Sequence, residues 1–369
     1  MTKKSATAGV SPIDQDTINR VNDAHKKLKD AKQSLKTVMQ GQDELIDLAL
    51  ATVISGAGGH ILFEGAPGTG KTTLVKHMAE VLNLTTKRIQ CTPDLMPSDV
   101  LGSYVEKINE ETGKPYLEFV NGPALSAQVL FIDEINRANP KTQSALLQLM
   151  QEGYATIEGK KVYAPVPFIV AATQNPFDAE GTNPLPQAQY DRFRTRPIVD
   201  NVDKDTDLAI GERDQNKPGE TAALYAMAND PDVDLTVRAE KEELSLDPVL
   251  GKNDIILYQK LVRDMPISPE LNAAIVNMMR FARPKDEEAP EFIKTKFNSG
   301  TDGHRTGQAL RAMVRANALI RGAHVPDESD LEAVAPHVMG HRVRLKGGAA
   351  TKHDTQETVI KQLMEHVLG

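Results

Sequence analysis

The chain has 369 residues, a formal net charge of -8, 40% hydrophobic residues and 25% charged residues. This length is sufficient for two domains, and the composition is that of a globular protein rather than a disordered one. The acidic balance and the aromatic content of 4% disfavour a broad nucleic-acid-binding surface, which needs basic patches and stacking side chains.

The single cysteine, Cys91, excludes a disulfide within the chain and suits a reducing compartment. We interpret it as a small buried hydrophobic residue. No apolar run is long enough to span a bilayer, and the N-terminal sequence lacks the apolar stretch of a secretory signal. We therefore expect a soluble, cytoplasmic protein with no membrane span.

The predicted elements divide the chain into four parts. Residues 1–30 form a polar leader that becomes helical at about Asp14, and residues 31–204 alternate apolar strands with helices. Residues 205–253 form an acidic linker or insertion, and residues 254–369 show helical spacing throughout. Because strands that alternate with helices indicate a mostly parallel sheet, we expect an α/β core followed by a smaller all-helical domain.

Five short apolar segments of the core are the predicted strands: residues 60–64, 87–91, 128–132, 167–171 and 196–200. A helix is predicted over residues 71–82. Asn139 and Pro140 predict the start of another helix, since Asn is a favoured N-cap and Pro is favoured in the first turn.

The string GAPGTGKT follows the first predicted strand and opens the helix after it. Glycines let such a loop turn its backbone N–H groups towards anionic oxygens, and the following helix adds the positive end of its dipole. Lys71 supplies a point charge to the β- and γ-phosphates of a nucleotide, and Thr72 offers a hydroxyl group to Mg²⁺. The context predicts a phosphate-binding loop; a glycine-rich turn with a solvated lysine is the weaker alternative.

Asp133 and Glu134 end the apolar strand 128–132, at the edge of the sheet where ligands bind. Asp133 suits the shell of a Mg²⁺ ion, and Glu134 suits the activation of an attacking water. The local alternative is an acidic pair that caps the next helix.

Two further segments carry candidate polar groups. Asn175 follows the strand 167–171 and could reach the γ-phosphate, although Asn-Pro is also a common turn. Arg192, Arg194 and Arg196 are either solvated surface charges or include a residue that reaches the nucleotide of a neighbouring subunit.

These motifs, in this order, resemble the AAA+ superfamily and, more narrowly, the MoxR family. The resemblance is carried by HILFEGAPGTGKT, RIQCTPDLMPSDVLG, LEFVNGPAL, VLFIDEINRANPKTQSALLQLMQEGYATIEG, VAATQNP and LPQAQYDRF. It implies an AAA+ P-loop NTPase core with a C-terminal helical lid and assembly into rings, typically hexamers. It also implies ATP and Mg²⁺ as cofactors and a chaperone-like remodelling or activation of a protein partner, often one with a von Willebrand A domain.

The resemblance also implies roles for individual residues. The loop and helix start resemble Walker A, so nucleotide contacts are expected from Gly65, Ala66, Pro67, Gly68, Thr69, Gly70, Lys71, Thr72 and Thr73. Gly41 and Gln42 resemble the segment that passes the adenine. Asp133 and Glu134 resemble Walker B, with Thr72 and Asp133 as the metal ligands and Glu134 as the carboxylate that activates the attacking water.

Three other residues complete the expected catalytic set. Asn175 resembles sensor 1, Arg192 resembles the arginine finger, and Arg305 resembles sensor 2, although TDGHRTGQAL stands where the family usually has serine-proline-arginine. The stretch Gly102–Phe119 resembles the helix-2 insert hairpin, and residues 153–165 resemble the hairpin before sensor 1.

The leading hypothesis is therefore a ring-forming ATP hydrolase that acts on a protein partner. Two alternatives are a nucleic-acid-stimulated motor or loader, and a nucleotide-gated scaffold with incidental turnover. A protein-threading unfoldase is not supported, since no aromatic–hydrophobic–glycine pore string is present.

Overall fold

The computed structural model describes residues 13–176, 181–199, 245–301, 303–346 and 355–369. The start of the predicted leader and most of the predicted linker, residues 205–244, lie outside the described residues. The boundaries of the four predicted parts stay predictions.

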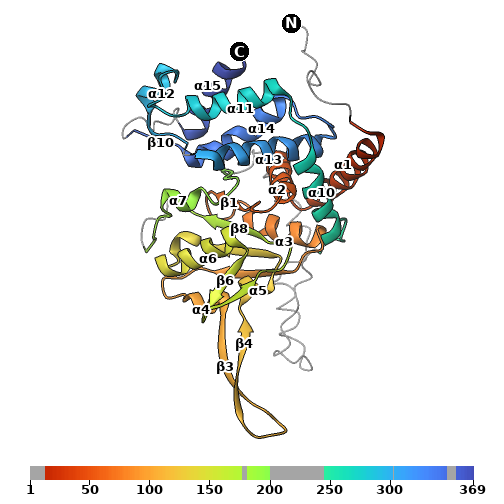
Figure 1. Ribbon diagram of the computed structural model, residues 1–369, viewed down its shortest axis with the longest axis vertical. Coiled ribbons are helices and arrows are strands. Elements are labelled where there is room, and N and C mark those ends of the chain that lie inside the picture. Colours follow the sequence, from red (N-terminus) through yellow and green to blue (C-terminus); the bar gives the residue numbers. More distant parts are fainter. Residues whose placement is uncertain (1–12, 177–180, 200–244, 302, 347–354) are drawn as a thin grey trace, which may run out of the picture.

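A parallel sheet lies at the centre of the core (Figure 1). Its strands run in the order β1-β8-β5-β2 and match four of the predicted segments: β1 (Ile61–Glu64), β2 (Thr86–Gln90), β5 (Val129–Asp133) and β8 (Ile169–Gln174). The fifth predicted strand, residues 196–200, is not a regular strand among the described residues. Instead, isolated bridges join Thr195 to Ile61 and Ile198 to Glu64, so this segment still runs beside β1.

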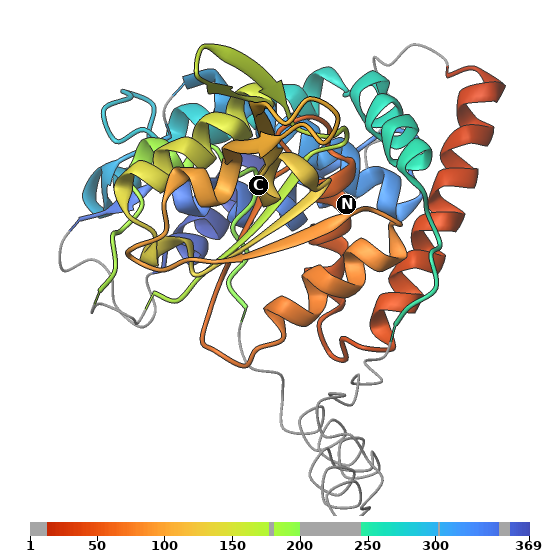
Figure 2. The same cartoon turned by 90° about the horizontal axis from the view of Figure 1, so that it is seen from below.

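Helices cover both faces of the sheet, because successive side chains of each buried strand point to opposite sides. Phe63 and Phe131 pack on the face covered by α2 (Asp43–Ile54) and α3 (Lys71–Val81). On the other face Leu62 and Ile132 pack against α4 (Pro97–Leu101), α5 (Pro123–Ser126) and α6 (Pro140–Glu152). Figure 2 shows α3 and α6 on opposite sides of the sheet.

The predicted start of α6 is confirmed. The side chain of Asn139 accepts a hydrogen bond of 3.0 Å from the backbone N–H of Thr142, and Pro140 occupies the first turn. The predicted helix at residues 71–82 is α3.

The N-terminal helix α1 (Gln15–Lys36) links the two halves of the molecule. Asp14 caps it, and one face, which includes Val21, Leu28 and Leu35, is buried. This helix contacts α2 and α3 of the core and α10 and α13 of the C-terminal part. The polar leader therefore passes, from Gln15 onwards, into an amphipathic helix that belongs to the hydrophobic core.

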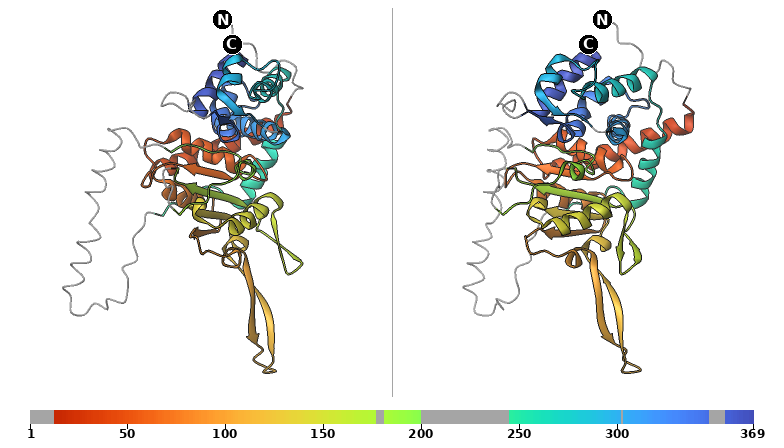
Figure 3. Two further views of the ribbon diagram at one scale, coloured as in Figure 1. Left: turned by 90° about the vertical axis from the view of Figure 1, so that its left-hand side faces the viewer. Right: turned by 60° about the vertical axis from the view of Figure 1, so that its left-hand side comes forward.

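Two antiparallel hairpins leave the core at the predicted positions. One consists of β3 (Gly102–Ile108) and β4 (Pro115–Asn121), and the other of β6 (Tyr154–Ile157) and β7 (Lys160–Tyr163). The β3–β4 ribbon projects from the end of the molecule opposite the C-terminal helices (Figures 1 and 3). Ile108 and Leu117 on it are 69% and 66% exposed.

The C-terminal part is helical apart from one short ribbon. Its helices are α10 (Lys252–Asp264), α11 (Pro269–Phe281), α12 (Glu291–Lys296), α13 (Gly303–Arg321), α14 (Glu328–Met339) and α15 (Gln356–Leu368). The ribbon pairs β9 (Phe297–Ser299) with β10 (Arg344–Leu345). A single hydrophobic cluster continues from the sheet through α2 into these helices. None of the described helices combines the length and hydropathy that a bilayer span requires.

Candidate nucleotide site

The loop between β1 and α3 is shaped to receive an anion. Gly68 and Gly70 have φ angles of 83° and 82°, a left-handed conformation that favours glycine. Within the described residues, the backbone N–H groups of Gly68, Thr69 and Gly70 donate to no carbonyl or side chain. Because the first N–H groups of a helix have no intrahelical partner either, the start of α3 presents a set of unused donors.

The side chain of Lys71 folds back over this loop. Its Nζ donates to the carbonyl oxygens of Ala66 and Gly65, at 2.5 and 3.1 Å, and to the hydroxyl of Thr69 at 3.0 Å. Partial burial lowers the pKa of Lys71, whereas the nearby carboxylate of Asp133 acts in the opposite direction. The ammonium group therefore lies inside the loop and within electrostatic reach of Asp133.

Asp133 ends β5 and is held from both neighbouring strands. Thr173 on β8 donates its hydroxyl to Oδ1 at 2.6 Å, and Arg88 on β2 donates to Oδ2 at 2.6 Å. The same Thr173 oxygen accepts the backbone N–H of Glu134 at 2.9 Å. One buried hydroxyl thus fixes both the carboxylate of Asp133 and the peptide that follows it.

Glu134 has a φ angle of 54°, which is uncommon for a residue with a side chain. Such strain occurs where the surroundings over-determine the backbone, often at functional sites. The carboxylate is turned towards β2, where Oε2 accepts from Nε2 of Gln90 at 2.9 Å and lies 3.2 Å from Nε of Arg137. The side chain is therefore restrained by two partners.

Asn175 and the Gly41–Gln42 segment border the same region. Asn175 directly follows β8, and its carbonyl accepts from Asn136 at 3.5 Å. Gln42 donates to the carbonyl of Thr69 at 3.4 Å, and its Oε1 is buried without a partner among the described residues. Both segments thus lie beside the elements that carry Lys71 and Asp133.

The three candidate arginines have different surroundings. Arg194 is tied to Ser55 and Ala57 of the core, and burial lowers its pKa to about 10. Arg196 is buried between Glu64 and Gln356. These contacts leave neither guanidinium directed at another molecule.

Arg192 is only half-buried. It donates to the carbonyl of Leu147, and its Nε has no partner among the described residues. Burial, and then the charge of Arg305, lowers the pKa of Arg192. Arg305 is exposed at the start of α13 and also lies within electrostatic range of Arg342. The candidate finger and the candidate sensor 2 thus lie near one another.

The sequence patterns did not indicate three residues of this site: Arg88, Gln90 and Thr173. Gln90 and Thr173 lie at the carboxyl ends of β2 and β8. Ligands bind at this edge of a parallel sheet, and that rule could have pointed to these two residues from the sequence. Their partners lie 44 and 40 residues away, and only the strand order brings them together.

Cys91 directly follows β2 and is 1% exposed, which confirms the interpretation as a buried residue. Burial, followed by the charges of Asp133 and Glu134, raises the pKa of its thiol to about 12. The thiol therefore stays protonated at neutral pH.

The donor set fits Mg²⁺ bound together with a nucleotide. No cluster of three or more His, Cys, Asp or Glu side chains suited to a metal is present in the described ranges. P-loop NTPases hold Mg²⁺ through one hydroxyl group, a carboxylate and phosphate oxygens, with water completing the shell. Thr72 at the start of α3 and Asp133 at the end of β5 are groups of the required kind.

Comparisons with known proteins agree with this arrangement. Residues 60–195 match the ATPase family associated with various cellular activities (AAA), and residues 291–363 match the AAA lid domain. The chain is 31% identical to Chaperone MoxR1 of Mycobacterium tuberculosis, over 90% of this chain and 80% of that protein. It is 36% identical to Protein MoxR of Paracoccus denitrificans, over 89% and 91% of the two chains.

The fold has a solved counterpart. The crystal structure of a Cytophaga hutchinsonii protein assigned as an ATPase superposes with a TM-score of 0.78 at 28% identity, covering 95% of this chain and 97% of that one. Two family profiles in the AAA order, and relatives that match over nearly the whole length, identify the family. The chain belongs to the MoxR family of AAA+ ATPases.

Proposed function

We propose that the chain hydrolyses ATP with Mg²⁺ in a homo-oligomeric ring, with six subunits as the expected number, and uses the energy to remodel or activate a protein partner. The observation that carries this proposal is the juxtaposition of three features at one edge of the sheet. These are the N–H donors of the 65–70 loop, the ammonium group of Lys71 and the carboxylates of Asp133 and Glu134.

The chain's own groups divide the work as follows. The 65–72 loop and Lys71 bind the phosphates, and Gly41 and Gln42 border the base. The unpaired buried Oε1 of Gln42 suits the exocyclic amine of adenine, which is a hydrogen-bond donor. Thr72 and Asp133 hold Mg²⁺, which when bound neutralises charge on the phosphate oxygens. Asn175 orients the γ-phosphate.

Glu134 is the group that accepts a proton from the attacking water. Its Oε2 is occupied by Gln90 and Arg137 in the present arrangement. Gln90 and Arg137 therefore restrain the general base, and exchange of these two contacts would free Oε2 for a water.

Thr173 is expected to position the metal ligand. Thr173→Val keeps the shape of the side chain but removes the hydroxyl between Asp133 and the Glu134 amide. We expect the Mg²⁺ requirement for hydrolysis to rise about 10- to 100-fold, as is typical when a partner of a metal ligand is lost. ATP binding without Mg²⁺ should be unchanged. Titrating hydrolysis against Mg²⁺ measures the effect.

Thr173→Ser is the matched control, since it retains the hydroxyl and should keep most of the wild-type Mg²⁺ response. An unchanged Mg²⁺ requirement in Thr173→Val would show that Asp133 needs no such support.

Arg192 and Arg305 are proposed to act on the nucleotide of the neighbouring subunit. Arg192 and Arg305 lie within electrostatic range of one another, so they can act on the same phosphate group. Arg192 is half-buried and donates to the carbonyl of Leu147, a neutral group, so its charge is suited to a transition-state phosphate on another subunit. The active site is then complete only in an assembly.

Mixing two inactive variants tests this arrangement. Arg192→Ala should lower the rate of phosphate release on the order of 10³-fold, as expected for an arginine finger, while ATP binding is retained. Adding Lys71→Ala protein, which carries an intact Arg192, should restore activity, because mixed neighbours form complete sites. Arg263→Ala, which alters an exposed arginine of α10, serves as the control.

Failure of the mixture to exceed the sum of its components would contradict an arginine that acts across subunits. A folded wild-type protein that releases no phosphate from Mg-ATP would contradict the proposed hydrolysis itself.

A protein is the proposed client, and a von Willebrand A domain is one expected partner. One relative is named a chaperone, and the β3–β4 ribbon exposes large apolar side chains, including Ile108, Tyr116 and Leu117. Contiguous exposed apolar groups favour contact with proteins rather than with phosphate backbones. Cytoplasmic location stays a prediction.

A further inference from the structure

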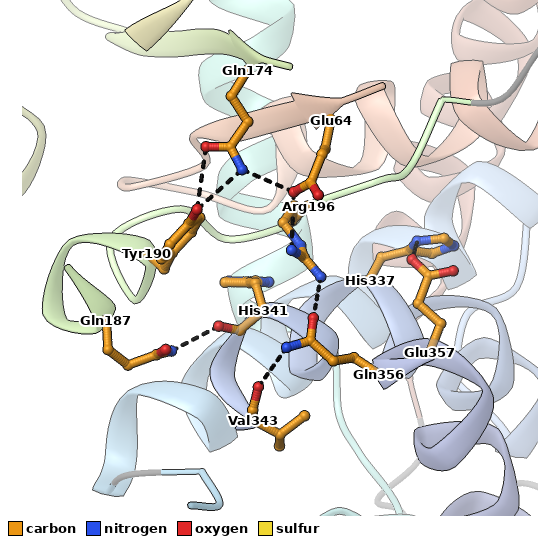
Figure 4. A network of polar contacts seen from close by, with 10 residues as sticks. All are labelled: Glu64, Gln174, Gln187, Tyr190, Arg196, His337, His341, Val343, Gln356 and Glu357. Carbon is orange, nitrogen blue, oxygen red and sulfur yellow. Dashed lines mark hydrogen bonds and ion pairs between the residues drawn. The ribbon is translucent and has the colours of Figure 1, made fainter. Parts of the chain in front are cut away.

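A chain of buried polar contacts crosses from the nucleotide edge of the sheet to the last helix of the lid (Figure 4). We infer that the contacts Glu64–Arg196–Gln356 couple the nucleotide site to the position of α15. This inference rests on the proposed function, because it assigns the route by which bound ATP acts on the lid.

At its core end, this series of contacts lies beside the phosphate loop and the segment that carries Asn175. Glu64 is the last residue of β1 and directly precedes the phosphate loop, whereas Gln174 directly precedes Asn175. Oε2 of Glu64 accepts from Nε2 of Gln174 and from Nη1 of Arg196, each at 2.9 Å. One carboxylate therefore joins the phosphate loop and the sensor 1 strand to Arg196.

At the lid end of this series of contacts, Arg196 bonds directly to residues of the C-terminal helical part. Nη2 of Arg196 donates to Oε1 of Gln356 at 2.6 Å, and Nε2 of Gln356 donates to the carbonyl of Val343 at 2.8 Å. The backbone N–H of Arg196 donates to the carbonyl of His337 on α14 at 2.9 Å. Gln356 is the first residue of α15, so this helix is attached to the core through its N-terminal side chain.

The contacts are buried, with side-chain exposures of 10% for Arg196 and 13% for Glu64. A buried ion pair is seldom more stable than well-packed apolar residues, so stability alone does not account for it. The ion pair does couple the movements of its two partners. If the carboxylate of Glu64 is displaced, the guanidinium of Arg196 follows it, because separating the charges in a region of low dielectric costs free energy.

The same interface contains buried atoms that make no hydrogen bond among the described residues. These are Nε of Arg196, Nδ1 of His337, Nδ1 of His341 and Oε1 of Glu357. Nδ1 of His337 and Oε1 of Glu357 lie 3.5 Å apart, within ion-pair distance but without the geometry of a hydrogen bond. Each buried polar atom without a hydrogen bond costs free energy, so these contacts hold α14 and α15 on the core less tightly than a fully paired interface would.

Binding of a triphosphate supplies the displacement. Lys71 now donates to the carbonyl of Gly65, the residue after Glu64. When Lys71 turns to a phosphate it releases that carbonyl, while Asn175 engages the same phosphate next to Gln174. Glu64 and its partner Gln174 are then both displaced from the nucleotide side, and Arg196 carries the movement to α15.

Hydrogen exchange with ATP tests the coupling in a Glu134→Gln background that holds ATP. In the Glu134→Gln protein, which is the parent of the other variants, ATP should protect the amides of residues 65–74 from hydrogen exchange and should also change the exchange rates in α15. Gln356→Ala removes the hydrogen bond between Arg196 and the half-buried side chain of Gln356, and it leaves the Glu64–Arg196 ion pair intact. We expect normal ATP protection at residues 65–74, but a ratio of α15 exchange rates with and without ATP that is reduced by about tenfold.

Gln362→Ala is the matched control, since Gln362 lies on the same helix, is exposed and accepts a hydrogen bond from Lys296 within the lid. Arg196→Lys, which keeps the charge beside Glu64 but cannot span both partners, should reproduce the loss. An undiminished α15 response in Gln356→Ala, with ATP bound, would overturn the coupling alone. Absence of ATP protection in the parent would overturn the proposed function, and the coupling with it.

Discussion

Lys71→Ala should weaken ATP binding at least about 100-fold, because it removes a charged donor from the phosphates in a partly desolvated loop. Lys71 is the side chain that folds into the 65–70 loop, where it occupies the carbonyls of Gly65 and Ala66. The remaining N–H groups still attract an anion, but the concentrated positive charge is lost. Calorimetric titration with ATP measures the affinity directly.

Lys76→Ala is the matched control, since this residue lies on the same helix and the same charge is removed. It should bind ATP like the wild type. Thermal unfolding of both variants shows whether the loop collapses without Lys71. An affinity of folded Lys71→Ala within a few-fold of wild type would contradict the assignment of the phosphate loop.

Glu134→Gln should retain ATP and stop its hydrolysis. The amide has the shape of the carboxylate and can still accept from Gln90, so the strained backbone at this position should persist. It cannot take a proton from water, and loss of a general base typically costs 10²- to 10⁴-fold. Phosphate release under saturating Mg-ATP, together with an ATP affinity, separates the two effects.

Glu111→Gln, at the exposed turn of the β3–β4 hairpin, controls for the change of charge and should leave turnover unchanged. Wild-type rates in Glu134→Gln would show that another group activates the water. The same variant, which should hold clients that the wild type releases, is also the reagent for identifying the protein partner.

Sequence patterns predicted most strands of the sheet and the position of the 65–72 loop, and the family resemblance implied both hairpins. These features depend on neighbouring residues: apolar runs define buried strands, glycines permit the loop, and Asn139 with Pro140 starts a helix. The family resemblance rests on the same local strings, which is why the comparisons agree with it. The fifth strand was predicted too regularly, because its pairing depends on β1 rather than on its own residues.

The amino-acid sequence by itself determined the phosphate loop, the acidic pair and the family, since their chemistry is encoded within a few consecutive residues. Only the tertiary structure showed that Arg194 and Arg196 are tied within the chain, whereas Arg192 is half-buried and donates to the carbonyl of Leu147. It likewise decided that Thr173 supports Asp133 and that Gln356 meets Arg196, contacts that span 40 and 160 residues. The physical reason is that strand order and helix docking, which arise from burial of the whole core, set these distances.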